Sequence, residues 1–208
     1  MFNQYLEMTA ENADIIIANS VIENLKFIVI SLDTIFKGEI GEDFYYEDYT
    51  FYFYHLQNAL TSCGNVINVF SSNLRREKRY NERARYLQKI FDVNICDYEW
   101  LFNKDFRNAN EHYDERYDLF NGIVGDFNLI NKNTPIKMKE EIIIKPHIRT
   151  LDIKRWIYTT YNKHGKQIEC DLCKLRDEAY SLLYKISMHP RLCEKCLTHV
   201  PTKEIISK

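Results

Sequence analysis

A short stretch of the chain, residues 105–118, carries side chains that could cut RNA without a metal ion. It reads DFRNANEHYDERYD, in which Asn108 directly follows Arg107 and His112 comes five residues after the arginine. Histidine exchanges a proton near neutral pH, so it could take one from a ribose 2′-hydroxyl or give one to a leaving 5′-oxygen. Arginine offers a planar fork of donors to a phosphate, and asparagine adds a neutral donor or orients the imidazole. Together these side chains suffice for cleavage through a 2′,3′-cyclic phosphate.

The same stretch has the spacing of a helix with one apolar side. We expect a helix over about 97–120, ended by Asn121 and Gly122. At about 100° per residue, the residues on its apolar side are Phe102, Phe106, Ala109, Tyr113, Tyr117 and Phe120. That side should pack on a core, so Arg107 and His112 should point away from it, toward solvent, a ligand or another subunit.

The plain alternative is a solvated helix surface without chemistry. Residues four apart are neighbours on a helix, so Arg107 and Glu111 would form an ordinary ion pair beside His112. Catalysis would need more than this one helix, because RNA cleavage uses an acid and a base and the helix offers one histidine. Two copies that face each other across a dimer axis would supply both.

The motif RNANEH at 107–112 resembles the R-x4-6-H motif of HEPN-domain proteins, in which a polar residue, often Asn, follows the arginine. The run EHYDER at 111–116 resembles the EHFDER run of some bacterial HEPN-like proteins. The resemblance implies His112 as general base and acid, Arg107 as phosphate ligand and Asn108 as the supporting polar residue. It further implies a bundle of four or five helices and a homodimer that brings two motifs together.

The resemblance also implies a function. Many HEPN domains are metal-independent endoribonucleases of toxin–antitoxin or anti-phage systems, so we expect RNA as substrate and an antitoxin or defence-system protein as partner. Other HEPN-like proteins are not catalytic. The alternative is therefore a helical binding protein in which Arg107 and His112 hold a subunit interface or a ligand.

A second candidate feature is the basic stretch LRREKRYNERARY at 74–86. Its cationic residues are Arg75, Arg76, Lys78, Arg79, Arg83 and Arg85. Tyr80 and Tyr86 lie between them, and only Glu77 and Glu82 oppose them. Such a stretch could clamp an RNA backbone and stack a base on tyrosine. The alternative is a solvated connection between helices.

The cysteines are the third candidate. Two CxxC pairs have the pattern of a structural zinc site, namely Cys170, Cys173, Cys193 and Cys196. A helix is expected over 172–187, and its length of about 24 Å would separate the pairs. His189 and His199 could instead join the second pair in a local site. The ribonuclease chemistry needs no metal. Cys63 and Cys96 stand alone and are expected to be core or near-core thiols.

Periodicity along the chain predicts a mainly α protein. Helices are expected over about 11–37, 47–73, 81–92 and 97–120, as an antiparallel bundle of four to five helices. β-branched and aromatic residues predict a small hairpin within 141–170, with a turn at 162–165. We therefore divide the chain into an HEPN-like bundle, 1–130, and a unit of hairpin, helix and Cys-rich tail, 131–208.

Composition excludes several classes of protein. Hydrophobic residues make up 45% and charged residues 28%, which is typical of a globular chain rather than a disordered one. The formal net charge of −2 gives no global basic field, so a nucleic-acid partner would need a local patch. The apolar runs are broken well short of the ~20 residues of a membrane span. We expect a cytoplasmic protein with free thiols and no membrane partner.

Overall fold

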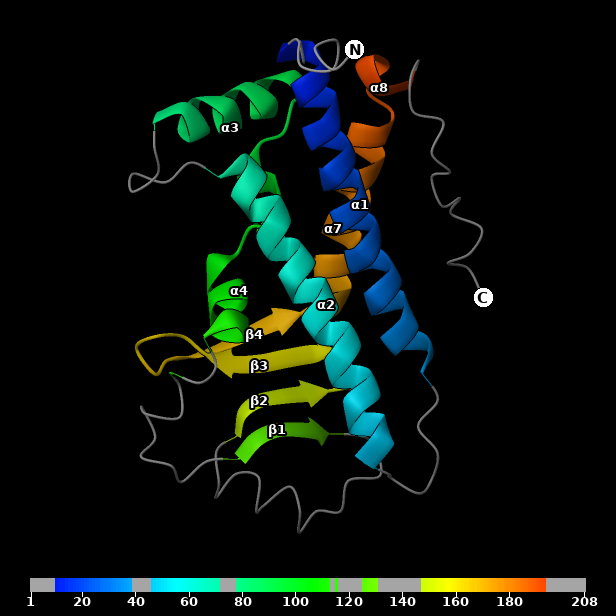
Figure 1. The fold of residues 1–208 in the computed structure, drawn as a ribbon. Coiled ribbons are helices and arrows are strands. Elements are labelled where there is room, and N and C mark those ends of the chain that lie inside the picture. The colour runs from blue at the N-terminus through cyan, green and yellow to red at the C-terminus, as the bar shows by residue number, and fades with distance from the viewer. Residues whose placement is uncertain are drawn as a thin grey trace, which may run out of the picture.

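The computed structural model describes residues 10–38, 46–71, 78–112, 115, 125–130 and 147–193. The described part is mainly helical and carries one small sheet (Figure 1). Its helices are α1 (Ala10–Lys37), α2 (Tyr46–Phe70), α3 (Lys78–Ile90), α4 (Lys104–Glu111), α7 (Leu172–Ser187) and α8 (Pro190–Cys193), with a 3-10 turn at Ile95–Asp97. Its strands are β1 (Gly125–Ile130), β2 (His147–Asp152), β3 (Ile157–Tyr161) and β4 (Gln167–Asp171).

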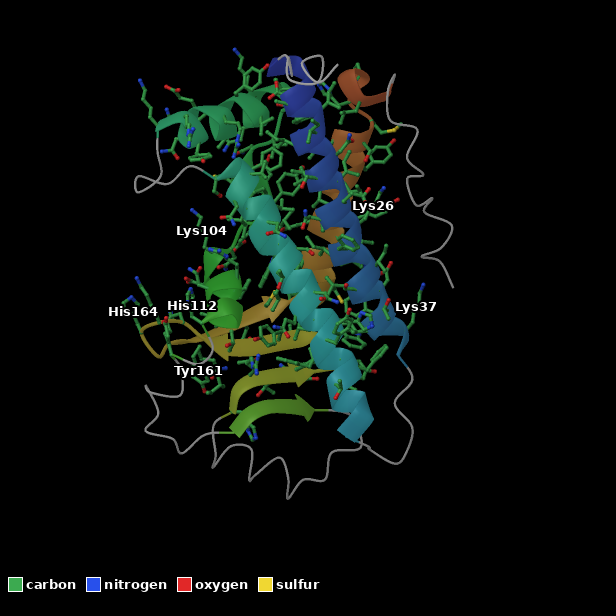
Figure 2. The ribbon with its side chains drawn as sticks, viewed as in Figure 1. Lys26, Lys37, Lys104, His112, Tyr161 and His164 are labelled. Atoms are coloured by element: carbon green, nitrogen blue, oxygen red, sulfur yellow. The ribbon has the colours of Figure 1, made fainter. Side chains whose placement is uncertain are left out.

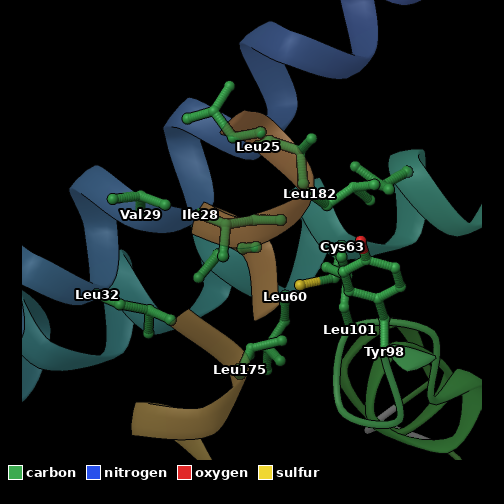
Figure 3. Close-up of a cluster of buried hydrophobic side chains, with 14 of the residues drawn as sticks. Leu25, Ile28, Val29, Leu32, Leu60, Cys63, Tyr98, Leu101, Leu175 and Leu182 are labelled. Carbon is green, nitrogen blue, oxygen red and sulfur yellow. The ribbon is translucent and has the colours of Figure 1, made fainter. Parts of the chain in front are cut away.

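The core lies where α1, α2 and α7 pack together. Apolar residues recur at helical spacing along α1, and Leu25, Ile28 and Leu32 are completely buried. Figure 3 shows these side chains in one buried cluster with Leu60 of α2 and with Leu175 and Leu182 of α7. Burial of each such side chain stabilises the fold by about 1.5–3 kcal/mol. The first and last long helices of the described residues thus share one core.

The sheet has the order β1-β2-β3-β4. β1 pairs with β2 in parallel, and the other neighbours are antiparallel. Leu151, Tyr158 and Cys170 follow one another across three strands in register, and all three are completely buried. One face of the sheet therefore packs on the helices, beside the N-terminal half of α2 (Figure 1).

The predicted turn between strands is confirmed. Gly165 has φ +71°, and Asn162 Oδ1 accepts hydrogen bonds from the backbone N–H of His164 at 2.9 Å and of Lys166 at 3.1 Å. The sheet is larger than the predicted hairpin, because β2 and β1 extend it. β1 precedes residue 130 and the other strands follow it, so both sides of the predicted boundary contribute to the sheet.

The predicted helices over 11–37, 47–73, 81–92 and 172–187 are confirmed to within a few residues by α1, α2, α3 and α7. The start predicted for the fourth helix is wrong, because α4 begins at Lys104 and not near Asp97. Its predicted end at Asn121–Gly122 lies outside the described residues.

α1 also bears on location. Judged by length and composition alone, Ala13–Lys37 could cross a membrane, although no such segment was expected from the sequence. The same helix supplies the buried side chains at the centre of the core, as a core helix of a soluble protein does. The fold is compatible with a soluble protein, and the cytoplasmic location stays a prediction.

Candidate functional site

Local capping explains why α4 begins late. Asn94 Oδ1 accepts from the Cys96 N–H at 3.2 Å and caps the short turn at Ile95–Asp97. Asn103 Oδ1 accepts from the Asp105 N–H at 3.0 Å and caps α4 itself. The chain therefore makes a separate turn between two asparagine caps, where helical periodicity alone predicted a continuous helix.

The turn before α4 is also bonded to a distant helix. Glu178 of α7 accepts two backbone hydrogen bonds on Oε2, from the N–H of Trp100 at 2.9 Å and of Leu101 at 2.8 Å. Burial raises the pKa of this carboxyl above its usual range, and the negative charge of Glu99 adds to the rise, whereas backbone hydrogen bonds from Leu101, Trp100 and Glu99 oppose it.

α4 packs by the side that the sequence predicted. Phe106 and Ala109 are buried, and Phe102, just before the helix, is partly buried against the same core. Tyr113, Tyr117 and Phe120, the remaining members of the predicted stripe, lie outside the described residues.

Arg107 occupies a different position from the one expected. It is half-buried and lies against α2 at Gly64, rather than on a free face. A Cβ atom added to Gly64 would stand 2.8 Å from Arg107 Cγ and 3.2 Å from its Nε. The arginine stem therefore crosses α2 at a place that only glycine leaves open. Its Nη1 also donates to Asn108 Oδ1 at 3.4 Å.

His112 lies at the end of α4 and faces solvent. It is the C-cap residue, and its backbone N–H donates to the Asn108 carbonyl at 3.1 Å. Its side chain is 52% exposed, and Nδ1 stands 3.2 Å from Glu115 Oε1. The side chain of Glu111, the predicted partner of Arg107, lies outside the described residues. Figure 2 shows His112 on the same side of the molecule as His164 of the hairpin turn.

We call Arg107, Asn108 and His112 the α4 triad. The structure keeps the three residues within about one and a half turns at the end of α4, with the arginine supported by α2 and the histidine accessible. No family model, no curated protein and no solved structure matches the chain. The α4 triad is therefore judged by its geometry and by the resemblance of its motif.

The basic stretch falls partly on α3. Lys78, Arg79 and Arg85 are exposed and Arg83 is half-buried, whereas Arg75 and Arg76 lie outside the described residues. The guanidinium carbons of Arg79 and Arg83 lie 4.8 and 5.2 Å from the ring centre of Tyr80. The tyrosine ring thus groups two of the cations.

α3 and α4 both rest on α2. Gln88 of α3 donates to the backbone carbonyl of Phe70, at the end of α2. Arg107 meets the same helix at Gly64, which is about 9 Å earlier along the helix axis. The two candidate elements are therefore anchored on neighbouring parts of one helix.

The described cysteines of the two pairs lie at opposite ends of α7. Cys170 is buried on β4 and Cys173 is half-buried in the first turn of α7, and burial raises the pKa of both thiols. Cys193 belongs to α8, beyond the far end of α7 (Figure 1). Cys196 lies outside the described residues, as does His199.

Within the described residues, no group of three or more His, Cys, Asp or Glu side chains could hold a metal ion. His189 packs its ring on Phe91 at 5.1 Å between ring centres. Zinc at these cysteines stays a prediction.

Sequence reasoning missed two residues that support the α4 triad. Gly64 carried a usable signal, because a glycine inside a helix costs about 1 kcal/mol relative to alanine and often marks a close approach of another segment. Glu178 carried none, because a carboxylate on an amphipathic helix has the pattern of an ordinary surface residue. Its partners lie far away in the sequence.

Proposed function

We propose that the protein is a metal-independent endoribonuclease of the HEPN type that cleaves RNA at the α4 triad. The observation that carries the proposal is the difference between two side chains of one short helix. Arg107 is half-buried and supported by Gly64 and Asn108, as a phosphate ligand should be. His112 is exposed at the end of the helix, where an RNA ribose can reach it.

The chemistry follows from these positions. His112 as the neutral base takes the proton of a ribose 2′-hydroxyl, and the 2′-oxygen attacks the adjacent phosphorus. Arg107 neutralises the charge that builds on the phosphate oxygens, with Asn108 fixing the guanidinium. A second histidine gives a proton to the leaving 5′-oxygen. The products are a 2′,3′-cyclic phosphate and a 5′-hydroxyl.

The second histidine comes from a second protomer in this proposal. A homodimer that brings the exposed end of α4 against its own copy provides His112 twice, once as base and once as acid. The four- to five-helix bundle and the toxin–antitoxin or anti-phage setting, with an antitoxin or defence protein as partner, come with the motif resemblance. They belong to the same proposal.

α3 is the RNA-backbone contact in this proposal. It holds five basic residues and one acidic residue, a net charge of +4 on 13 residues. Lys78 and Glu82 form one exposed pair at 3.5 Å. Tyr86 is 45% exposed and offers a ring face to a base. Phosphates attracted to α3 would then lie near the α2 surface that also carries α4.

A second function has one observation in its favour. Arg107 fills a contact between α4 and α2, and His112 pairs with Glu115, so both side chains also have structural partners. The protein would then be a non-catalytic HEPN-like binding protein, in which the α4 face holds a subunit interface. In this alternative, a structural zinc ion at the C-terminal cysteines would be part of the interaction module.

RNA cleavage in EDTA separates the two functions. We expect His112→Ala and Arg107→Gln to lower the cleavage rate of end-labelled RNA at least ~100-fold, because general acid–base catalysis contributes that much or more. Arg107→Gln keeps most of the stem over Gly64 and removes the charged fork. The matched controls are His164→Ala and Arg155→Ala, which change exposed residues of the same types on the sheet turns.

The controls should stay within about two-fold of the wild type, and the 3′ product ends should be cyclic phosphates. Equal cleavage by the wild type, His112→Ala and Arg107→Gln, with dimerisation unchanged, would contradict the ribonuclease proposal. A wild type that binds RNA or its own copy but cuts no RNA would favour the second function.

A further inference from the structure

One carboxylate of α7 ties down the turn that leads into α4. Both N–H groups bonded to Glu178 Oε2 belong to consecutive residues, Trp100 and Leu101. Leu101 is completely buried, so its N–H could not donate to solvent water if the carboxylate were removed. The position of the turn relative to α7 therefore depends on this side chain.

The turn at Trp100 and Leu101 also sets the position of α4. The Trp100 ring stacks on the Phe106 ring, with 6.1 Å between centres and 3° between planes. Lys174 of α7 places its ammonium 5.3 Å from the centre of the Trp100 ring. Phe106 directly precedes Arg107 in α4. A shift of Trp100 would thus be passed to the arginine through one stacked pair of rings.

We propose that Glu178 is a positioning residue for the α4 triad, which it holds in place through the turn at Trp100 and Leu101. The catalytic consequence rests on the proposed ribonuclease function, whereas the positioning itself does not. Two N–H groups that point at one oxygen favour an ionised acceptor, because charge-assisted hydrogen bonds are shorter and stronger than neutral ones. An amide in place of the carboxylate keeps an acceptor oxygen but loses that charge.

Among the charged and titratable groups around Glu178, its own carboxylate is the acceptor for the N–H groups of this turn. The side chain of Glu99, on the turn itself, is a like charge that raises the pKa of Glu178, whereas the Glu99 backbone N–H acts on it in the opposite sense, as those of Trp100 and Leu101 do. Cys63 of α2 and Cys170 of β4 are buried thiols whose pKa is raised by burial, so they stay neutral. Lys174 of the same helix lies over the Trp100 ring, and its ion pair is with Asp171 at 3.7 Å.

Fluorine NMR on protein that contains 5-fluorotryptophan tests the positioning without RNA. The chain has two tryptophans, so Trp100 reports on the turn and Trp156 is an internal control, assigned with Trp156→Phe. Glu178→Ala should shift the Trp100 signal and speed amide hydrogen exchange at Trp100 and Leu101 at least ten-fold. Glu178→Gln should restore most of that protection.

The same variants should change the backbone amide shifts of Arg107 and His112. In the cleavage assay, Glu178→Ala should lower kcat at least ten-fold and leave KM within about three-fold, because α4 moves while α3 does not. The matched control is Asp177→Asn. It removes one negative charge at the position of α7 directly before Glu178, where the side chain is 68% exposed. It should behave as the wild type.

Three results separate failure of the positioning from failure of the proposed function. Unchanged Arg107 and His112 shifts in Glu178→Ala would overturn the positioning role, even if the turn amides exchanged faster. The expected shifts in a protein that cuts no RNA would uphold the positioning and overturn the ribonuclease function. If Glu178→Ala does not fold, Glu178→Asp, with a carboxylate one methylene shorter, should lose the protection, and full protection there would overturn the positioning role.

Discussion

α3 and α4 are both short helices on α2, but they hold their arginines in opposite ways. α3 exposes most of its cations. The Lys78 side chain is 90% exposed and Arg79 and Arg85 are exposed, whereas Arg83 is half-buried beside Tyr80. α4 holds Arg107 half-buried against a glycine of the neighbouring helix. Exposed charge acts at a distance and is screened by salt, whereas a fixed guanidinium acts at one place. One arrangement suits capture of a polyanion and the other suits chemistry on one phosphate.

The contacts that hold the two helices in place differ in the same way as their arginines do. α4 has an asparagine cap, and the turn that leads into it is bonded to Glu178 of α7. α3 is joined to the end of α2 by Gln88 and buries Ala84 and Leu87. Long-range bonds thus converge on the element that must be placed accurately.

The largest effect is expected where the contact of Arg107 with Gly64 of α2 is disturbed. In Gly64→Ala the new Cβ would lie 2.8 Å from Arg107 Cγ, so the arginine must move. We expect RNA cleavage to fall by roughly 10- to 100-fold, because a displacement of about 1 Å has that effect on positioned groups. The free energy of unfolding should change by less than about 2 kcal/mol, since overpacking is offset by the higher helix propensity of alanine.

Cleavage assays and urea denaturation would measure both quantities, with Thr61→Ala on the exposed side of α2 as the control. Full activity in Gly64→Ala would show that the position of Arg107 does not matter. The contrast with α3 would then disappear.

A smaller effect is expected for the surface charges of α3. The triple variant Arg79→Gln, Arg83→Gln, Arg85→Gln should weaken RNA binding and flatten its dependence on salt. If each arginine neutralises one phosphate, the slope of log K against log salt should lose about 0.7 per contact for single strands. Fluorescence anisotropy over a series of KCl concentrations measures the slope.

The matched control removes three exposed cations from the sheet turns, in Lys154→Gln, Arg155→Gln, Lys163→Gln. Its salt slope should equal that of the wild type. If the α3 triple variant kept the full slope, the capture role of α3 would be wrong, and the fixed arginine of α4 would have to account for binding as well.

The smallest effect concerns pH. Glu178 has a raised pKa in the folded protein, so the fold binds its proton more tightly than the unfolded chain does. The wild type should therefore lose stability relative to Glu178→Gln as pH rises from about 4.3, the ordinary value for glutamate, through the raised value. Below that window the difference between the two proteins should be constant. The change should be small because the side chain is only half-buried.

Urea denaturation of both proteins between pH 3.5 and 7 would measure this difference. If the difference in free energy of unfolding stayed constant across this range, the pKa of Glu178 would not be raised in the folded protein. α4 would then resemble α3, whose contacts on α2 include no carboxylate among the described hydrogen bonds.

Local signals explain which parts of the fold could be predicted. The apolar spacing of α1 and α7 runs over several turns, and Asn162 and Gly165 are strong turn residues, so these elements were predicted well. Within α4, the same reasoning placed Phe106 and Ala109 in the core. Each of these predictions depends on residues that are close in sequence.

The parts that were not predicted depend on residues far apart. α4 begins at Lys104 because two asparagine caps and Glu178, on another helix, interrupt a periodic pattern. A helical wheel counts neighbours within one helix, so it could not show that Gly64 would bring α2 against Arg107. The roles of the α4 triad, the α3 cations and the cysteine pairs stay predictions.

The packing of α1 on α7 also has a consequence in time. α1 ends at Lys37 and α7 begins at Leu172, so α1 leaves the ribosome well before α7. At the usual pace of synthesis this interval is on the order of ten seconds, during which the apolar side of α1 lacks the surface of α7. Glu178 arrives with the same helix. A nascent chain can therefore complete the core shared by α1 and α7, and set the turn before α4, only after α7 has been made.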